Sequence, residues 1–459
     1  ERVVVEVVQR VLEQNAPDPQ ASERLLFGAI YEERRRLERY PSDPRAAEDR
    51  AFFDAIQGEA GKASPERQRE LLRRLAERFT EEVTGHFNPA VYTVATRILP
   101  PALSVLLNTM SPIRLLSLAR GKNAGVVSQV RLTGATESLQ RLAKIGTTVL
   151  VPTHFSNLDS ILVGLAVYLL GLPPYTYGAG LNLFSNPILG FFMHNLGAYK
   201  VDRRKKAAVY KAVLKNYAGC SMELGYHNLF FPGGTRSRSG AAEKSLKRGL
   251  LGMGLSAYIR NLQSGRAKPD IFVVPCTINY QLVLEAETLI ADFLKEAGKS
   301  RYIIEDDEFS KPRVVLDFVS KLISLNSTVT LRFGQPLDVF GNTVDEDGRS
   351  HDRRGRPVDR SRYVLVDGRP QASPQRDAEY TTELAASVVE AYARDSMVTS
   401  TNLLAYVLFE QLLEKNPGLD LYRLLRTGGA DTSTPATVIY SRLEATLLGL
   451  KDAEAQGLV

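Results

Sequence analysis

Apolar side chains recur at helical spacing through the first 120 residues of the chain. They return every three or four positions in segments 25–31 and 71–79, and charged residues fill much of the sequence between them. This period is typical of helices that bury one face and expose the other. The pattern predicts a helical N-terminal unit over residues 1–120. Within it, Val91 to Met110 is apolar enough for either a buried helix pair or a helix in a membrane interface.

The period changes near residue 125. From there to about residue 340, short runs rich in β-branched and aromatic residues alternate with helical patterns. This alternation predicts an α/β domain over residues 121–340, with a mixed, largely parallel sheet flanked by helices. The expected strands are Val126–Leu132, Thr147–Val151, Asn228–Phe231, Ile271–Val274 and Val329–Phe333. The expected helices are Glu137–Lys144, Ser160–Leu172, Lys205–Leu224 and Leu246–Leu262.

The alternation stops at residues 341–375, which are polar and rich in turn-forming pairs such as Asp367-Gly368. Such a composition predicts an excursion from the domain, either with a β-hairpin about Tyr363–Val366 or as a mobile flap. Residues 376–459 return to a helical pattern. They are expected to form a C-terminal helical extension.

Composition narrows the class of protein. Of the 459 residues, 44% are hydrophobic and 24% charged, so the chain can build a core and is not a disordered protein. The two cysteines, Cys220 and Cys276, exclude a disulfide framework and a four-cysteine zinc site, and they suit a reducing compartment. No apolar run has the length and purity of a spanning helix. We expect neither a signal peptide nor a bound metal.

Charge is distributed unevenly along the middle of the chain. The formal net charge is +6, yet residues 145–199 contain a single charged side chain, Asp159. Residues 199–248 then contain twelve Lys and Arg against three acidic residues. The basic excess is therefore local, and it indicates an anionic ligand or surface next to an uncharged stretch.

His154 stands out in the uncharged stretch because it follows the strand predicted over 147–151, and Asp159 comes five residues later. Ligand sites of α/β sheets gather at the carboxyl ends of strands. A buried carboxylate needs a partner, and an imidazole N–H bonded to it would leave the other ring nitrogen more basic. The alternative is a helix capping box of Ser156 and Asp159, with His154 as a loop residue.

Two further segments suggest anion binding. Phe230 to Gly240 combines glycines, hydroxyl groups and two arginines at the end of a predicted strand, which suits a backbone cradle for phosphate. Gly197 to Lys206 places cations at a predicted helix start, where the helix dipole disfavours them. Either segment could instead be a solvated basic surface. A fourth segment, Val273 to Tyr280, reads as a plain core strand.

Several classes lack their signatures in this sequence. It contains no Gly-x-Ser-x-Gly nucleophile elbow, no Walker loop and no His-Glu-x-x-His metal motif. Aromatic residues are not interleaved with the basic window as single-stranded nucleic-acid binding requires. Nucleic acid is therefore not an expected partner.

Taken in order, the four segments resemble the motifs of the glycerolipid acyltransferase family, which contains the glycerol-3-phosphate and 1-acylglycerol-3-phosphate O-acyltransferases. The resemblance spans about Val130 to Val339. The matching segments are His154 to Asp159 (His-x4-Asp), Gly197 to Arg203 (a Gly-led motif ending in Arg), Phe231 to Ser237 (Phe-Pro-Glu-Gly-Thr-Arg-Ser) and Val274-Pro275 (an apolar strand with Val-Pro).

The resemblance implies an enzyme of phospholipid biosynthesis that moves a fatty acyl group to the sn-1 hydroxyl of glycerol 3-phosphate. The donor would be acyl-CoA or acyl carrier protein as co-substrate, with no bound cofactor. Tyr210-x6-Tyr217 and the chain length are more similar to this branch. Asp202-Arg203 is similar to the sn-2 branch, so 1-acylglycerol 3-phosphate is the alternative acceptor. The implied location is a peripheral or monotopic position on the cytoplasmic face of an anionic membrane.

One position departs from the family pattern, because Gly233 stands where the family usually carries glutamate. A carboxylate that would bond substrate or brace the arginines is missing there. Glu223 and Glu243 are candidate substitutes. The departure also leaves open a non-catalytic module that binds lipid surfaces.

The family's chemistry implies roles for the matched residues. His154 would deprotonate the acceptor hydroxyl, and Asp159 would orient its ring and stabilise the imidazolium. The uncharged stretch would supply an acyl groove, although ordinary core packing explains many of its side chains as well. The expected phosphate-binding cations are Arg203, Lys205, Arg236 and Arg238. The expected oxyanion or motif loop is Gly233, Gly234, Thr235 and Ser237. The expected groove residues are Ile161, Leu165, Leu189, Phe191 and Phe192.

Overall fold

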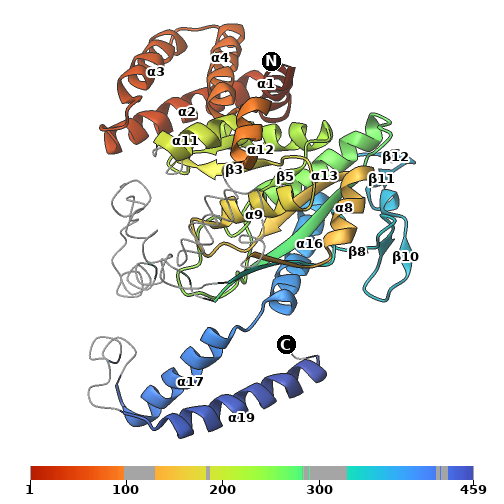
Figure 1. Ribbon diagram of the computed structural model, residues 1–459. Helices are drawn as coiled ribbons and strands as arrows, with labels where there is room; N and C mark the ends of the chain where they lie inside the picture. Colours follow the sequence, from red (N-terminus) through yellow and green to blue (C-terminus); the bar gives the residue numbers. More distant parts are fainter. Residues whose placement is uncertain are drawn as a thin grey trace.

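The computed structural model describes residues 2–97, 130–181, 184, 187–281, 283, 289, 328–419, 424 and 433–457 (Figure 1). The strand expected over Val126–Leu132 is described from Val130 onward, and most of the apolar segment from Val91 to Met110 lies outside these residues. Within the described part, no helix is both long and apolar enough to cross a bilayer.

A seven-stranded sheet forms the centre of the molecule. Neighbouring strands are parallel except β6 and β7, which are antiparallel. The predicted mixed, largely parallel α/β sheet is therefore confirmed, and the fourth segment is a core strand as expected. The strands are β1 (Val130–Gly134), β2 (Thr147–Pro152), β3 (Thr176–Gly180), β4 (Ala198–Val201), β5 (Asn228–Leu229), β6 (Ile271–Tyr280) and β7 (Val329–Phe333), in the order β1-β7-β6-β2-β5-β3-β4.

Helices cover both faces of the sheet because its strands direct alternate side chains to opposite sides. On β2, Val149 and Val151 pack with α12, α13 and α16, whereas Leu150 packs with α8 and α9 on the other face. The flanking helices are α8 (Thr136–Ile145), α9 (Asp159–Leu169), α11 (Pro187–Asn195), α12 (Ala208–Glu223), α13 (Arg248–Gln263) and α16 (Pro374–Asp395).

The pattern of the sequence does not predict β3, β4 or α11. β3 reads Thr-Tyr-Gly-Ala-Gly and β4 reads Ala-Tyr-Lys-Val, so both are short and β3 is rich in residues with low strand propensity. Parallel pairing of β3 with β5 and β4 stabilises them as strands. Their identity therefore depends on neighbours that are distant in the sequence.

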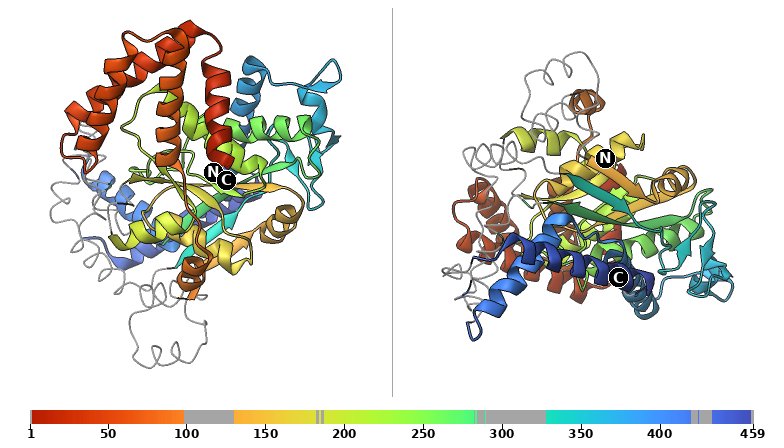
Figure 2. Two further views of the ribbon diagram at one scale, coloured as in Figure 1. Left: turned by 90° about the horizontal axis from the view of Figure 1, so that it is seen from above. Right: turned by 60° about the horizontal axis from the view of Figure 1, so that its bottom comes forward.

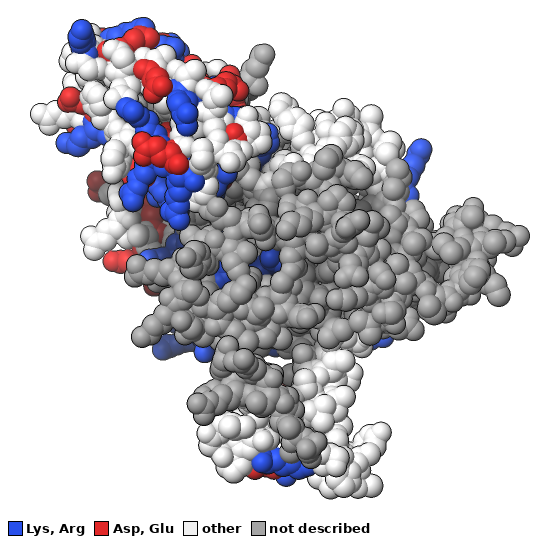
Figure 3. All heavy atoms as spheres, turned by 90° about the vertical axis from the view of Figure 1, so that its left-hand side faces the viewer, with Lys and Arg blue, Asp and Glu red and all other residues white. Residues whose placement is uncertain are grey.

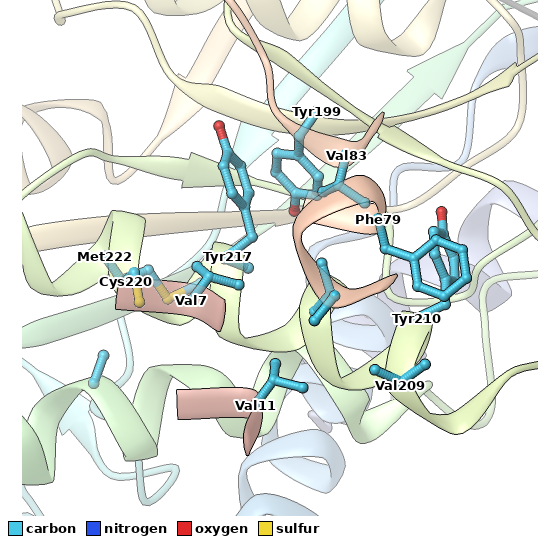
Figure 4. Close-up of a cluster of buried hydrophobic side chains, with 14 of the residues drawn as sticks. Val7, Val11, Phe79, Val83, Tyr199, Val209, Tyr210, Tyr217, Cys220 and Met222 are labelled. Atoms are coloured by element: carbon cyan, nitrogen blue, oxygen red, sulfur yellow. The ribbon is translucent and has the colours of Figure 1, made fainter. Parts of the chain in front are cut away.

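Four N-terminal helices pack on the α12 side of the sheet (Figures 1 and 2). Figure 4 shows Val7, Val11 and Phe79 from these helices against residues of α12. The ring of Phe79 meets that of Tyr210 edge-on, with centroids 5.4 Å apart. These helices and the α/β domain therefore share one apolar core. The helices are α1 (Arg2–Asn15), α2 (Pro19–Arg39), α3 (Ala46–Ala60) and α4 (Pro65–Val83).

Buried charges also join these helices to the segment before α12. Lys205 Nζ lies 3.0 Å from Glu33 Oε2 and 3.1 Å from Glu82 Oε2. Arg36 lies 2.8 Å from the same Glu33 oxygen and 2.6 Å from Asp49 Oδ2. All five side chains are buried. We call Glu33, Arg36, Asp49, Glu82 and Lys205 the interhelical charge cluster.

Residues 341–375 form two small sheets beside the main one (Figure 1). A β-hairpin forms close to the predicted place, but it begins at Leu365, because Tyr363 and Val364 belong to the 3-10 helix η2 (Arg360–Val364). Its turn is Asp367-Gly368, where both residues have positive φ. The strands are β8 (Thr343–Val344), β9 (Ser350–His351), β10 (Pro357–Val358), β11 (Leu365–Val366) and β12 (Arg369–Pro370).

After α16, helices α17 (Ser400–Lys415) and α19 (Ala436–Ala455) pack side by side. They lie at the opposite end of the molecule from α1–α4 (Figure 1). Figure 3 shows basic and acidic side chains intermixed over the N-terminal helices, whereas the C-terminal pair at the bottom is mostly uncharged on this face. Tyr406, Tyr440 and Leu448 are among its exposed large side chains.

Candidate active site

Three neighbouring parallel strands bring the predicted site residues to one edge of the sheet. β6, β2 and β5 lie side by side and run in the same direction, so their carboxyl ends face the same edge. Tyr280 ends β6, His154 follows β2 by two residues, and Phe231 follows β5 by two residues. This edge is where α/β sheets usually bind ligands.

His154 and Asp159 form the hydrogen-bonded pair that the sequence predicts. His154 Nδ1 lies 2.8 Å from Asp159 Oδ2, and the Asp159 side chain is fully buried. The same oxygen accepts hydrogen bonds from the backbone N–H groups of Phe155 at 2.6 Å and Ser156 at 2.9 Å. The partner at Nδ1 assigns the ring proton to that nitrogen and leaves Nε2 as the basic nitrogen.

Tyr280 completes the environment of Asp159. Its hydroxyl group donates a hydrogen bond to Asp159 Oδ1 at 2.5 Å, and the tyrosine is buried. Both carboxylate oxygens therefore have partners, and none of these partners is a permanent cation. Sequence reasoning missed this role because no local pattern marks Tyr280. The sequence feature that could have drawn attention to Tyr280 is its place at the end of the strand-like segment Val273 to Tyr280.

The capping-box alternative accounts for only part of this geometry. The N–H of Ser156 does donate to Asp159, as a capping box requires. However, Ser156 Oγ accepts from the N–H of Leu158 at 3.1 Å, and the N–H of Asp159 donates to the backbone carbonyl oxygen of Ser156 at 3.2 Å. Helix α9 begins at Asp159 with no side-chain cap on Leu158. The carboxylate of Asp159 instead joins the helix start to His154 and Tyr280.

The loop after β5 fixes His154 from a second side. The rings of His154 and Phe231 stack with centroids 4.2 Å apart and planes inclined by 27°. The N–H of Ser237 donates to the carbonyl oxygen of His154 at 2.7 Å. The imidazole is thus positioned by its hydrogen bond, by ring stacking and through its own backbone.

The expected motif loop has a defined geometry. Gly234 has a φ of 80°, and a β-carbon there would lie only 2.6 Å from Cδ of Lys247. A larger residue would therefore be strained and would displace the lysine. The N–H of Gly234 already donates to the carbonyl oxygen of Phe231 at 3.0 Å. Ser237 Oγ donates to the carbonyl oxygen of Ala241 at 2.7 Å, and Thr235 is exposed.

Cations surround this loop, although not the full set that the sequence suggests. Arg203 is exposed, and Arg236 and Arg238 are half-buried. Lys247 lies close to these cations. Burial lowers the pKa of Lys247, and the nearby positive charges of Arg203 and Lys206 lower it further. Sequence reasoning missed Lys247, which lies thirteen residues beyond Gly234. The sequence feature that could have identified Lys247 is its place near the end of the basic segment 199–248.

Lys205 does not join these cations, which corrects the expectation that it binds phosphate. Its side chain is 1% exposed, and its ammonium group is enclosed by Glu33 and Glu82 of the interhelical charge cluster. The same group lies 4.8 Å from the ring centroid of Phe79. Lys205 therefore attaches the N-terminal helices α2 and α4 to the segment before α12.

The expected groove residues occupy different environments. Leu165 is 1% exposed and belongs to the core between α9 and the sheet, so it is not an open groove residue. Ile161 is partly buried against the same core. Phe191 is 54% exposed and meets Phe192 edge-on with ring centroids 5.5 Å apart. The side chain of Leu189 lies outside the described part of the structure.

The other histidines have different partners. His227 stacks on Tyr175, and burial lowers its pKa to about 4. His86 and His194 lie ring to ring, and His351 bonds an aspartate in the excursion. Across the residues that the structure describes, no three His, Cys, Asp and Glu side chains gather in a way that could hold a metal ion.

Comparison with known proteins bears on this geometry. Residues 134–279 match the family model described as Acyltransferase. The chain is 27% identical over 298 residues to the glycerol-3-phosphate acyltransferase of Pseudomonas syringae pv. syringae (strain B728a), which covers 63% of this chain and 32% of the relative. It is 29% identical over 299 residues to the protein of the same name from Pseudomonas aeruginosa (strain LESB58), with the same shares covered.

A shorter match extends these findings. The glycerol-3-phosphate acyltransferase of Pseudomonas fluorescens (strain SBW25) is 28% identical over 219 residues, which is 47% of this chain and 24% of the relative. The chain thus spans about a third or less of the length of the curated relatives it matches. The resemblance to the glycerolipid acyltransferase family is confirmed for the α/β domain.

Proposed function

Because residues 134–279 form an acyltransferase-family domain, we propose that this chain moves a fatty acyl group from an acyl thioester to the sn-1 hydroxyl of glycerol 3-phosphate. The observation that carries the proposal is the His154–Asp159 pair, whose Nε2 is the base that the reaction needs. The cations beside the neighbouring loop suit a phosphorylated acceptor. The names of the bacterial relatives support this acceptor.

The reaction begins when His154 Nε2 takes the proton of the acceptor hydroxyl as its oxygen attacks the thioester carbonyl carbon. A C–O bond forms, and the carbonyl electron pair moves to oxygen. The intermediate then collapses, the C–S bond breaks, and the thiolate receives the proton from the imidazolium. Asp159 stabilises that imidazolium and keeps the ring in place. This sequence of steps requires no covalent acyl-enzyme.

The tetrahedral oxyanion needs hydrogen-bond donors close to His154. The N–H of Gly234 is already bonded to Phe231, so we assign the donor role to the N–H of Gly233. The phosphate of the acceptor binds near Arg203 and Lys247, with Arg236 and Arg238 from the loop. Guanidinium groups suit this role because they form paired hydrogen bonds with phosphate oxygens.

The donor is acyl-CoA or acyl carrier protein, and no bound cofactor takes part. Phe191, Phe192 and Ile161 are the side chains assigned to the acyl chain. We further propose a peripheral or monotopic location on the cytoplasmic face of an anionic membrane. The exposure of Phe191 and the local basic excess of residues 199–248 support it.

The test is a panel of acceptors, each incubated with one acyl-CoA, with release of free thiol as the readout. Glycerol 3-phosphate, 1-acylglycerol 3-phosphate and dihydroxyacetone phosphate form the panel. We expect the first to give the fastest release and His154→Ala to abolish it while the thermal unfolding temperature stays near that of the parent. Retained acylation by a purified, folded His154→Ala protein would rule out the base assignment.

The second candidate is transfer to the sn-2 hydroxyl of 1-acylglycerol 3-phosphate, which the sequence pair Asp202-Arg203 favours. In that case 1-acylglycerol 3-phosphate gives the fastest release of thiol among the three acceptors. If no acceptor releases thiol above the uncatalysed rate, the chain is a non-catalytic lipid-surface module.

A further inference from the structure

Glu243 lies against Gly233, at the position where the family's glutamate is absent. A β-carbon on Gly233 would lie 2.7 Å from Glu243 Oε1, 2.8 Å from its Cγ and 3.1 Å from its Cδ. The carboxylate of Glu243 therefore fills the space in which a side chain at residue 233 would start. Glycine at this position makes room for it.

The hydrogen bonds of Glu243 are incomplete. Oε1 accepts a hydrogen bond from the backbone N–H of His154 at 3.2 Å. Oε2 is buried and has no hydrogen-bond partner among the described residues. Buried carboxylate oxygens are normally hydrogen-bonded, because removing them from water is costly. An unpartnered oxygen beside a candidate base therefore indicates a donor that arrives with a ligand.

The charges around Glu243 are those of the candidate site. Burial raises its pKa; its own backbone N–H, that of His154 and the His154 ring lower it, and the charge of Asp159 raises it. The phenol of Tyr392, from α16, is also close enough for the Glu243 charge to raise its pKa. Glu243 thus shares one electrostatic environment with His154 and Asp159, and no Lys or Arg among the residues that the structure describes forms an ion pair with it.

The other candidate substitute has a different place. Glu223 Oε1 and Oε2 accept hydrogen bonds from two nitrogens of Arg10 at 2.7 Å and 2.8 Å. Glu223 therefore attaches α1 to the end of α12. It serves as a matched control.

We propose that Glu243 supplies the missing carboxylate from ten residues further along the chain, and that its Oε2 accepts a hydrogen bond from the acceptor hydroxyl that is not acylated. This inference rests on the proposed function. Glu243 is then a positioning residue that presents the neighbouring hydroxyl to His154, and it determines which acceptors bind productively.

The chemistry of the acceptor gives this role a specific signature. Glycerol 3-phosphate carries a hydroxyl group next to the one that is acylated, whereas dihydroxyacetone phosphate carries a carbonyl group there. A carboxylate can accept from the hydroxyl but has nothing to donate to the carbonyl. A glutamine can donate its amide N–H to the carbonyl. The parent should prefer glycerol 3-phosphate, and Glu243→Gln should lose that preference.

The experiment measures kcat/KM for both acceptors with one acyl-CoA in the parent, Glu243→Gln and Glu223→Gln. We expect Glu243→Gln to lower the ratio of the two kcat/KM values about tenfold to a hundredfold, as loss of a hydrogen bond to a charged group implies. Glu223→Gln should leave the ratio unchanged. An unchanged ratio in a folded Glu243→Gln protein overturns the inference.

A second variant keeps the test decisive if glutamine is not tolerated. Gly233 has no positive φ, so a side chain is allowed there once Glu243 is removed. The double variant Gly233→Glu, Glu243→Ala should recover activity with glycerol 3-phosphate at least tenfold over Glu243→Ala alone. Absence of recovery in a folded double variant overturns the claim that the two positions share one function.

The two levels of proposal fail in different ways. If the parent releases thiol with glycerol 3-phosphate and Glu243→Gln keeps its acceptor ratio, only the role of Glu243 is lost. If the parent releases no thiol with any acceptor, the proposed function is lost.

Discussion

The interhelical charge cluster and the environment of His154 are both buried and both contain carboxylates, but their partners differ. In the interhelical cluster, Glu33 and Glu82 bond to the ammonium group of Lys205, and Asp49 bonds to Arg36. Beside the sheet edge, Asp159 bonds to backbone N–H groups, a tyrosine and an imidazole, and Glu243 bonds to the backbone N–H of His154. Permanent cations neutralise the first group, whereas neutral donors solvate the second.

The pKa directions follow this difference. Burial alone would raise the pKa of Asp49, but the hydrogen bond from Arg78 and the charges of Lys205 and Arg36 lower it below its ordinary value. Burial raises the pKa of Glu243, and the weaker donors around it do not reverse the shift. Carboxylates that are neutralised by cations hold helices together, while a carboxylate without a cation retains the capacity to bond a ligand.

Asp159→Asn is the most severe test of the environment of His154. An amide cannot stabilise the imidazolium as a carboxylate does, and it can hold the ring in the wrong tautomer. We expect kcat with saturating acyl-CoA and glycerol 3-phosphate to fall about 10⁴-fold, as it does for the same change at the orienting aspartate of a Ser-His-Asp triad. Thermal unfolding is the control for folding. A kcat within tenfold of the parent would contradict the assignment of Asp159.

Lys205→Met tests the paired cluster. Removing the ammonium group leaves Glu33 and Glu82 buried without their shared cation, so we expect the free energy of unfolding to fall by about 3–5 kcal/mol. Urea unfolding at pH 7 measures this loss. The exposed Lys211, on α12, gives a matched control, and Lys211→Met should change stability by less than about 0.5 kcal/mol. If both variants lose the same free energy of unfolding, Lys205 has no special role in the interhelical charge cluster.

These outcomes separate what the sequence could predict from what it could not. The His154–Asp159 pair was predictable because its five-residue spacing and its strand end are local features. Lys205 was misassigned because its partner Glu33 lies 172 residues away, on a helix whose docking no local pattern reveals. The same limit hid Tyr280, which reaches Asp159 from 121 residues away. Charge alone predicts neither which cations face the ligand nor which hold helices together.

Lys247→Met tests whether the cations near the motif loop differ from those of the paired cluster. Lys247 is packed over Gly234. Burial lowers the pKa of Lys247, and the positive charges of Arg203 and Lys206 lower it further. An anionic ligand would relieve that repulsion. We expect KM for glycerol 3-phosphate to rise about tenfold or more, the value of a hydrogen bond to a charged group, with KM for acyl-CoA changed far less.

The matched control is Lys268→Met. Lys268 lies before the amino-terminal end of β6 and donates a hydrogen bond to the carbonyl oxygen of Lys144, at the other edge of the sheet. Its removal changes net charge by the same amount but should leave both KM values unchanged. Equal rises of KM for acceptor and donor in Lys247→Met would count against a phosphate role.

The smallest expected effect is on the pH dependence of stability, and it separates the two groups by sign. The folded-state pKa of Glu243 lies above its ordinary value of 4.5. Below that ordinary value Glu243 is protonated in both states and carries no penalty. As pH rises through the folded pKa, the folded state must bury a charge, so this group lowers stability at neutral pH.

Glu243→Gln removes that charge. We expect the variant to match the parent at pH 4 and to be more stable at pH 7 by less than about 1 kcal/mol, because water still screens the carboxylate in part. Asp49, whose folded pKa is lowered, has the opposite sign, since its contribution is present at neutral pH and is lost as pH falls below 3.8. Asp49→Asn should therefore be less stable than the parent at pH 7, with a smaller difference at acid pH. Urea unfolding measures these signs at pH 4 and pH 7 for Glu243→Gln, and at pH 7 and about pH 3 for Asp49→Asn, because the contribution of Asp49 is lost only below pH 3.8. A shared sign would remove the distinction between a saturated and an unsaturated carboxylate.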